Sequence, residues 1–269
     1  MNANKALWEK GDFTRLAATI RDSGEELVDT LGIREGMDVL DLGCGDGTTA
    51  LPEAERGANV LGVDIASNLV AAGRARAAAA GLDNVRFQEG DASDLRDLAD
   101  ESFDLVVSIF GAMFAPRPVD VAREMVRVTR PAGRIVMGNW IPGDPTLVAQ
   151  ILKISASYTP PPPEGFVSPV TWGIRQEVEK RFAAASVDPF AIDCQRATYT
   201  FRYPGPPEDF VALFRNYYGP TMNAFEAATA NGQEDELLAE LNQLFIEQNK
   251  GGAARTEIPA TYLKVTVQL

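Results

Sequence analysis

The sequence contains no histidine, the side chain that proteins most often use as a general base near neutral pH and as a ligand of transition metals. Catalytic triads with a histidine base and zinc sites with histidine ligands are therefore excluded. There are only two cysteines, Cys44 and Cys194, in separate segments with neither a metal-binding spacing nor a disulfide framework. Chemistry in this chain has to rely on carboxylates, tyrosines, lysines, hydroxyl groups or positioning, and we expect no metal site.

Basic residues and long apolar runs are also scarce. Among 269 residues, 25 lysines and arginines stand against 38 aspartates and glutamates, which gives a formal net charge of −13. Such a charge disfavours binding to nucleic acid and to anionic membrane surfaces. No apolar run approaches the ~20 residues of a membrane span, and the N-terminal segment lacks the apolar core of a signal peptide. We therefore expect a cytoplasmic protein that acts on a small molecule, without nucleic acid or membrane partners.

Glycine is concentrated in one stretch, residues 37–47 (MDVLDLGCGDG). Its apolar residues predict a short buried strand at 39–42, and Gly43, Gly45 and Gly47 predict a tight turn into a helix. Glycines at such a turn let the backbone approach a ligand closely. By itself this G-x-G-x-G spacing is a weak signal, because a glycine-rich turn can also be only a turn.

Acidic residues mark the ends of three successive predicted strands. Asp41 precedes the glycine turn, Asp64 ends the strand expected at 59–64, and Asp91 ends the segment 85–91. In doubly wound folds a carboxylate at the end of the second strand holds the two hydroxyls of a ribose. The alternative for Asp41 and Asp91 is an ordinary helix or turn cap.

Over residues 30–140 these motifs resemble the class I S-adenosylmethionine-dependent methyltransferases, in particular the ubiquinone/menaquinone-biosynthesis type. The matching segments are V-L-D-L-G-C-G-D-G, V-D-I-A, G-D-A and F-D-L-V-V-S. The resemblance implies S-adenosylmethionine as cofactor and S-adenosylhomocysteine as product. It also implies transfer of a methyl group, by in-line displacement, to a small apolar or aromatic molecule.

The resemblance assigns cofactor contacts to the glycine loop, to the strand ends and to an N-terminal helix. In the core these are Asp41, Gly43, Cys44, Gly45, Asp64, Ile65, Asp91, Ala92, Ser108 and Phe110. Asp64 would hold the ribose hydroxyls, Asp91 the adenine edge, and Asp41 the loop or the cofactor amine. From the N-terminal helix, Trp8, Phe13 and Arg15 would cover the cofactor, with Arg15 paired to its carboxylate. Packing is the alternative for Ser108, Phe110 and this helix.

Fold class follows from the order of the predicted elements. Strands separated by helices of this length pair in parallel with right-handed crossovers. We expect an α/β fold with a Rossmann-like, seven-stranded, mostly parallel sheet, an antiparallel last strand, helices on both faces and a helical cap insertion. The expected divisions are an N-terminal helical lid (1–30), a cofactor-binding core (31–143), a cap and substrate region that includes the sixth strand (144–257), and a final core strand (258–269).

Patterning places the later elements as well. Helices are expected at 5–31, 48–57, 67–80, 117–129, 144–158, 171–185, 207–218 and 234–249. Strands are expected at 103–108, 133–139, 197–203 and 258–269. Pro131–Gly133 is expected to be a turn.

Aromatic residues crowd the segment after residue 139. Trp140, Trp172 and Phe214 are candidate walls of a substrate chamber, and the adjacent Tyr217 and Tyr218 are candidate catalytic residues because the chain has no histidine base. The alternative is that Trp140 and Trp172 belong to the core and that the two tyrosines pack the cap.

Two other functions stay open at this point. The first is a protein that binds S-adenosylmethionine or S-adenosylhomocysteine without transferring a methyl group. The second is an NAD(P)-dependent oxidoreductase. Against it, the loop departs from the G-x-G-x-x-G spacing, and none of the six tyrosines is followed four residues later by lysine.

Overall fold

The structure is a computed structural model that describes residues 3–269. Its seven strands form one sheet in the order β3-β2-β1-β4-β5-β7-β6. The first two residues of the predicted lid lie outside that range. The strands are β1 (Asp38–Leu42), β2 (Asn59–Asp64), β3 (Val85–Glu89), β4 (Phe103–Ile109), β5 (Thr129–Trp140), β6 (Ile192–Tyr203) and β7 (Thr256–Gln268). The first five pair in parallel, and β7 runs antiparallel to both β5 and β6. The predicted fold class is confirmed.

The helices in chain order are α1 (Ala3–Glu9), α2 (Thr14–Ala17), α3 (Arg21–Asp29), α4 (Ala50–Glu55), α5 (Ser67–Ala80), α6 (Pro118–Val128), α7 (Leu147–Tyr158), α8 (Arg175–Ala183), α9 (Pro207–Tyr217), α10 (Gly219–Ala230) and α11 (Glu234–Gln248). The short 3-10 helices are η1 (Ala112–Phe114), η2 (Pro169–Gly173) and η3 (Pro189–Ala191).

The ends of two helices are set by single residues. Gly81 ends α5 in the left-handed conformation, and Pro118 begins α6 where its missing N–H costs nothing.

Alternation along the central strands separates two apolar cores. Val39, Leu105 and Val107 belong to one core with α3, α4 and α5, whereas Leu40 and Val106 belong to the other with α6 and α8. These side chains are completely buried, as expected for parallel strands covered on both faces. The helices therefore hold the carboxyl ends of β1, β2 and β4 at one edge of the sheet.

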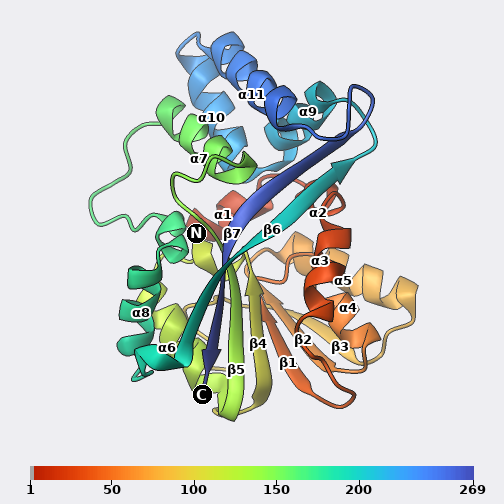
Figure 1. Cartoon of the computed structure of the whole chain (residues 1–269), viewed down its shortest axis with the longest axis vertical. Coiled ribbons are helices and arrows are strands. Elements are labelled where there is room, and N and C mark those ends of the chain that lie inside the picture. The colour runs from red at the N-terminus through yellow and green to blue at the C-terminus, as the bar shows by residue number, and fades with distance from the viewer. Residues whose placement is uncertain (1–2) are drawn as a thin grey trace.

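The last two strands extend away from the helix-covered parallel part of the sheet. β6 and β7 are long, pair over their whole length, and extend in Figure 1 toward a group of helices at one end of the molecule. This group, α7, α9, α10 and α11, is called the cap here. α7 packs on α10 and α11, and α9 packs on α10 and α11. Because β5 leads directly into α7, the cap lies at the carboxyl-end edge of the parallel strands.

Some element boundaries differ from those expected. The N-terminal helix is broken into α1, α2 and α3, and the segment 171–185 divides into η2 and α8. α10 was not among the expected helices; Pro220 stands in its first turn, where proline is favourable. The turn at Pro131–Gly133 lies inside β5, where Ala132 has a φ of 63° and the pairing with β4 shifts register. No helix in residues 3–269 is long and apolar enough to cross a membrane.

Candidate functional site

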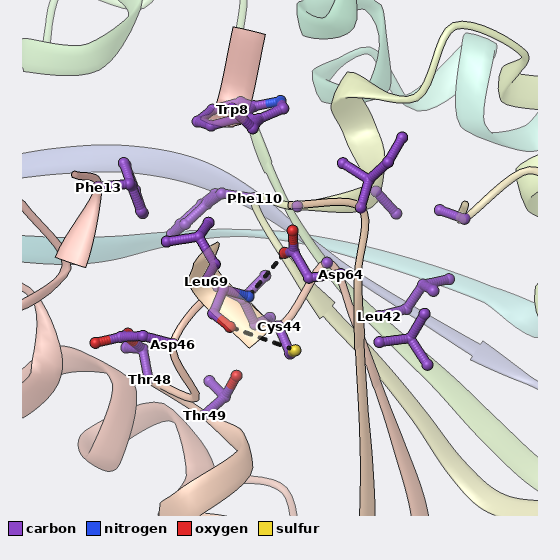
Figure 2. Close-up of a pocket in the computed structure, with 18 of the residues that line it drawn as sticks. Trp8, Phe13, Leu42, Cys44, Asp46, Thr48, Thr49, Asp64, Leu69 and Phe110 are labelled. Atoms are coloured by element: carbon purple, nitrogen blue, oxygen red, sulfur yellow. Dashed lines mark hydrogen bonds between the residues drawn. The ribbon is translucent and has the colours of Figure 1, made fainter. Parts of the chain in front are cut away.

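A cavity lies at the carboxyl ends of β1, β2 and β4, where the two halves of the parallel sheet diverge. Its empty space is about 910 Å³ when the open mouth is counted. Figure 2 shows Trp8 and Phe110 across the cavity from Cys44 and Thr49. Predicted cofactor residues that line it are Trp8, Phe13, Gly43, Cys44, Gly45, Asp64, Ile65, Asp91, Ala92 and Phe110. The tertiary structure thus brings together most of the predicted cofactor residues.

The glycine loop forms the floor of this cavity. Gly43, Gly45 and Gly47 all have positive φ angles, of 72°, 55° and 85°. A β-carbon at position 43 would lie 2.6 Å from the Cα of Gly111, so the loop presses directly on the turn after β4. A β-carbon at position 45 would meet no atom within 4 Å. Gly43 therefore serves packing, whereas Gly45 leaves the cavity open.

Asp64 connects the end of β2 to the glycine loop. Its Oδ2 accepts a hydrogen bond from the Gly45 amide at 2.8 Å, and its Oδ1 accepts one from the Ala66 amide at 2.9 Å. Burial raises the pKa of Asp64, and these amide donors oppose the shift. The side chain fixes the loop and still lines the cavity.

Asp91 is a turn cap that also lines the cavity. Its Oδ1 accepts hydrogen bonds from the amide and the hydroxyl of Ser93, at 2.9 and 2.7 Å, which is a turn cap. It also lines the cavity together with Ala92. The cap orients the carboxylate at the end of β3.

Residues 3–20, with α1 and α2, contribute Asn4, Trp8, Phe13 and Ile20 to the cavity wall. The ring of Trp8 lies 5.7 Å from that of Phe13 and 4.9 Å from that of Phe114. Lys5 Nζ donates to Glu89 Oε1 at 2.6 Å and to the Ile65 carbonyl at 3.0 Å, so α1 is tied to the ends of β2 and β3. The helical lid predicted over 1–30 stays a prediction, and Lys5 connects its first helix to the core.

Three predicted cofactor residues do not line the cavity. Arg15 pairs with Asp12 at 3.2 Å and is 66% exposed, so the structure does not place it in the cavity wall. Ser108 is buried under the loop, where its Oγ donates to the Leu42 carbonyl at 2.6 Å and accepts from the Ala112 amide at 3.0 Å. Asp41 is buried there too, and its Oδ2 accepts from Thr49 Oγ1 at 2.6 Å. Ser108 and Asp41 support the loop from below.

The predicted chamber walls and catalytic tyrosines also lie outside the cavity lining. Trp140 stacks on Phe110 with ring centres 3.7 Å apart, and Trp172 packs under Arg181. Phe214 packs against Phe201 of β6 and Phe245 of α11, and Tyr218 contacts the rings of Trp8 and Phe13. Burial raises the pKa of Tyr218 well above its ordinary value, and Tyr217 ends α9. Catalytic and substrate roles for these residues stay predictions.

Sequence reasoning missed several residues of the cavity wall. The largest is Tyr199 of β6, which lines the cavity although it is more than 130 positions from the glycine loop in a chain numbered 1–269. Asp46, Thr48 and Thr49 were missed as well. Their place directly after the glycines was a usable signal, whereas the alternating pattern of β6 could not identify the element facing Tyr199.

Glu53 of α4 is a buried carboxyl without a partner. Its side chain is fully buried, and neither oxygen has a hydrogen-bond partner among the described residues. Burial, then repulsion from Asp41, raises the pKa of Glu53 well above its ordinary value, and burial raises the pKa of Asp41 to about 7. The folded protein thus retains protons that the unfolded chain releases above about pH 4, so these groups make stability fall as pH rises from about 4 through 7.

We expect Glu53→Leu to raise the free energy of unfolding at pH 7 by about 1–3 kcal/mol, because it removes an unsatisfied buried polar group. Urea titrations at pH 5 and pH 7 should show a smaller loss of stability with rising pH than in the wild type. Glu55→Leu, on the exposed side of the same helix, is the control and should change stability by less than about 0.5 kcal/mol. Destabilisation by Glu53→Leu would show that the carboxyl has a partner.

Comparisons with known proteins agree with this geometry. A protein-family model described as a methyltransferase domain matches residues 40–137. An uncharacterised protein of Mycobacterium tuberculosis is 36% identical over 83% of this chain and 80% of that protein. Nocamycin O-methyltransferase of Saccharothrix syringae is 38% identical, over 48% of this chain and 50% of that protein. The solved YcgJ protein of Bacillus subtilis has a similar fold, with a TM-score of 0.59 at 21% identity over 92% of this chain and 98% of that one.

Proposed function

The chain belongs to the class I S-adenosylmethionine-dependent methyltransferases, and we propose that its methyl acceptor is a small apolar or aromatic molecule with an acidic hydroxyl group. The observation that carries the proposal is the composition of the cavity wall. Trp8, Phe13, Phe110 and Tyr199 supply aromatic surface, and the charged residues in the described wall are Asp46, Asp64 and Asp91.

The cavity fits the cofactor. S-adenosylmethionine carries a sulfonium and an ammonium group, and carboxylates suit both charges. Gly45 leaves the floor open, Asp64 would hold the ribose, and Asp91 with Ala92 would face the adenine. When bound, the cofactor supplies an electrophilic methyl group. Trp8 and Phe13 would keep water from that group, which favours loss of charge from the sulfonium.

Charge in the wall bears on the acceptor. The described lining includes three aspartates and no lysine or arginine, so a carboxylate or phosphate on the acceptor would find no cationic partner there. Arg21 and Arg76 both pair with Asp46, at 2.9 and 3.3 Å, and offset part of this negative charge. An uncharged, flat acceptor is therefore the better match to the aromatic surface.

We propose an acidic acceptor because the described cavity wall offers no carboxylate that is free to act as a general base. Asp64 and Asp91 accept hydrogen bonds from the chain itself, and Asp46 is paired with two arginines. A phenol or enol ionises easily enough to need little from a general base, and its alignment would then carry most of the acceleration. One relative, nocamycin O-methyltransferase, has a name consistent with methylation of oxygen. A role for Tyr217 or Tyr218 as a base remains a proposal, and Tyr218 would act from behind Trp8.

Incubation with isotopically methyl-labelled cofactor tests the proposal directly. Panels of phenols and enols, of carboxylates, and of phosphorylated amines would be compared by mass spectrometry, with Asp64→Ala as the blank. We expect labelled methyl ethers from the first panel and none from the other two. Transfer only to anionic acceptors would contradict the proposed acceptor class. Tight cofactor binding without transfer to any panel would favour a binding protein.

A further inference from the structure

Tyr199 has a hydroxyl group whose bonding capacity is unused. The side chain is 1% exposed, it lines the cavity, and its oxygen has no hydrogen-bond partner among the described residues. Leaving a buried hydroxyl unpaired typically costs about 1–3 kcal/mol. Burial, with Tyr262 and Asp41 nearby, raises the pKa of Tyr199 well above its ordinary value, so the group is a neutral donor.

The hydroxyl lies beside the far end of the glycine loop. A β-carbon on Gly24 of α3 would be 2.9 Å from the Tyr199 oxygen, 2.7 Å from Thr48 Cγ2 and 2.8 Å from the Thr48 carbonyl. In Figure 2, Asp46 and Thr48 lie on the opposite side of Cys44 from Asp64. Asp64 and Asp91 would mark the adenosine end of the cavity, so the amino-acid end of the cofactor would lie on the side of Thr48.

α3 and β6 hold this tyrosine firmly. Ser23 Oγ donates to the Thr200 carbonyl at 3.1 Å and accepts from the Thr200 amide at 2.9 Å. The Arg202 amide donates to the Thr19 carbonyl at 2.7 Å. Phe110 meets the Tyr199 ring edge-on at 5.1 Å. The phenol is therefore oriented before any ligand arrives, and a donor fixed in advance loses little entropy on binding.

Other polar side chains in the cavity wall already use their donors. Thr49 Oγ1 donates to Asp41 at 2.6 Å, Thr48 Oγ1 to Asp46 at 3.4 Å, and Cys44 Sγ to the Gly45 carbonyl at 3.6 Å. Asn4 has an interaction partner of its own. The described lining contains no lysine or arginine, and among its side chains the Tyr199 hydroxyl is buried without a partner.

We propose that the Tyr199 hydroxyl donates a hydrogen bond to the carboxylate of the cofactor's amino-acid end. β6, at the edge of the sheet and far from the glycine loop in sequence, would then contribute to the cofactor site. The interaction rests on the proposed function only in that S-adenosylmethionine is the ligand; it is independent of the acceptor. It also takes over the role predicted from sequence for Arg15.

Calorimetric titration of Tyr199→Phe tests the contact with two probes. S-adenosylhomocysteine contains the carboxylate, whereas 5′-methylthioadenosine keeps the adenosine and the sulfur but lacks the amino-acid end. A hydrogen bond to a charged group predicts roughly 10-fold or greater weakening for the first probe and no change for the second. Tyr203→Phe, the same change on the same strand with its ring stacked on Phe210 at 5.4 Å, should bind both probes as the wild type does.

Thermal melting separates this contact from a purely structural role. The unliganded Tyr199→Phe protein should melt at or above the wild-type temperature, because the removed hydroxyl has no partner, while its stabilisation by S-adenosylhomocysteine should shrink. Equal weakening of both probes, no weakening of either, or a lower melting temperature without ligand would overturn the proposed contact. Failure of the wild-type protein to bind S-adenosylhomocysteine would instead overturn the cofactor assignment on which the contact depends.

Discussion

Replacing Asp64 by alanine should weaken binding of S-adenosylhomocysteine roughly 30- to 1,000-fold, which corresponds to about 2–4 kcal/mol. The carboxylate accepts from the amides of Gly45 and Ala66, so its removal loosens the cavity floor and leaves two donors unpaired. It also removes the group expected to hold the ribose hydroxyls. Both losses fall on the cofactor, and titration calorimetry measures their sum.

Two companion variants sharpen the measurement. Asp64→Asn keeps the size of the side chain and one acceptor oxygen, so we expect an intermediate loss of affinity. Asp97→Ala, at an exposed aspartate outside the cavity lining, should bind as the wild type does. Wild-type affinity in Asp64→Ala would contradict the assignment of this strand end to the cofactor.

Gly43→Ala should destabilise the fold by about 3 kcal/mol or more. The residue has a φ of 72°, which costs a side chain roughly 1 kcal/mol, and its β-carbon would lie 2.6 Å from the Cα of Gly111. Backbone on both sides cannot move aside as a flexible side chain would, so overpacking adds to the conformational cost. Urea denaturation followed by circular dichroism measures the total.

Substitutions at Gly81 and Gly45 separate the cost of the positive φ angle from the cost of the contact with Gly111. Gly81 has a φ of 67° and no atom within 4 Å of an added β-carbon, so Gly81→Ala should cost only about 1 kcal/mol. Gly45 is equally uncrowded but lies in the cavity floor, so Gly45→Ala should match Gly81→Ala in stability and lose cofactor affinity. If Gly43→Ala cost no more than Gly81→Ala, the contact with Gly111 would not be tight.

Local signals in the sequence predicted the parallel core well. β2 and α5 have the expected bounds, because an apolar strand and a helix closed by Gly81 are specified by neighbouring residues. Asp64 and Asp91 could be assigned to one site for a related reason. Carboxyl ends of neighbouring parallel strands meet at the same edge of a sheet whatever the loops between them do.

Non-local packing decided what the sequence left open in the cap. Tyr218 and Phe214 had the right chemistry for a chamber, but their rings pack against Trp8 and Phe245, respectively. An aromatic residue at helical spacing buries its ring against whichever surface the fold presents, and periodicity does not identify that surface. Arg15 is similar, since its side chain pairs with Asp12 and does not line the cavity.

The sequence by itself determined the parallel core and the glycine loop, because these depend on apolar runs and glycine positions that a few adjacent residues carry, whereas the ligand class followed from the resemblance of these motifs to a known family. Only the tertiary structure decided that Tyr199 joins the cavity and that Glu53 is buried without a partner. Both facts depend on contacts between segments distant in the chain. Such contacts follow from how whole elements pack, and no local pattern encodes them.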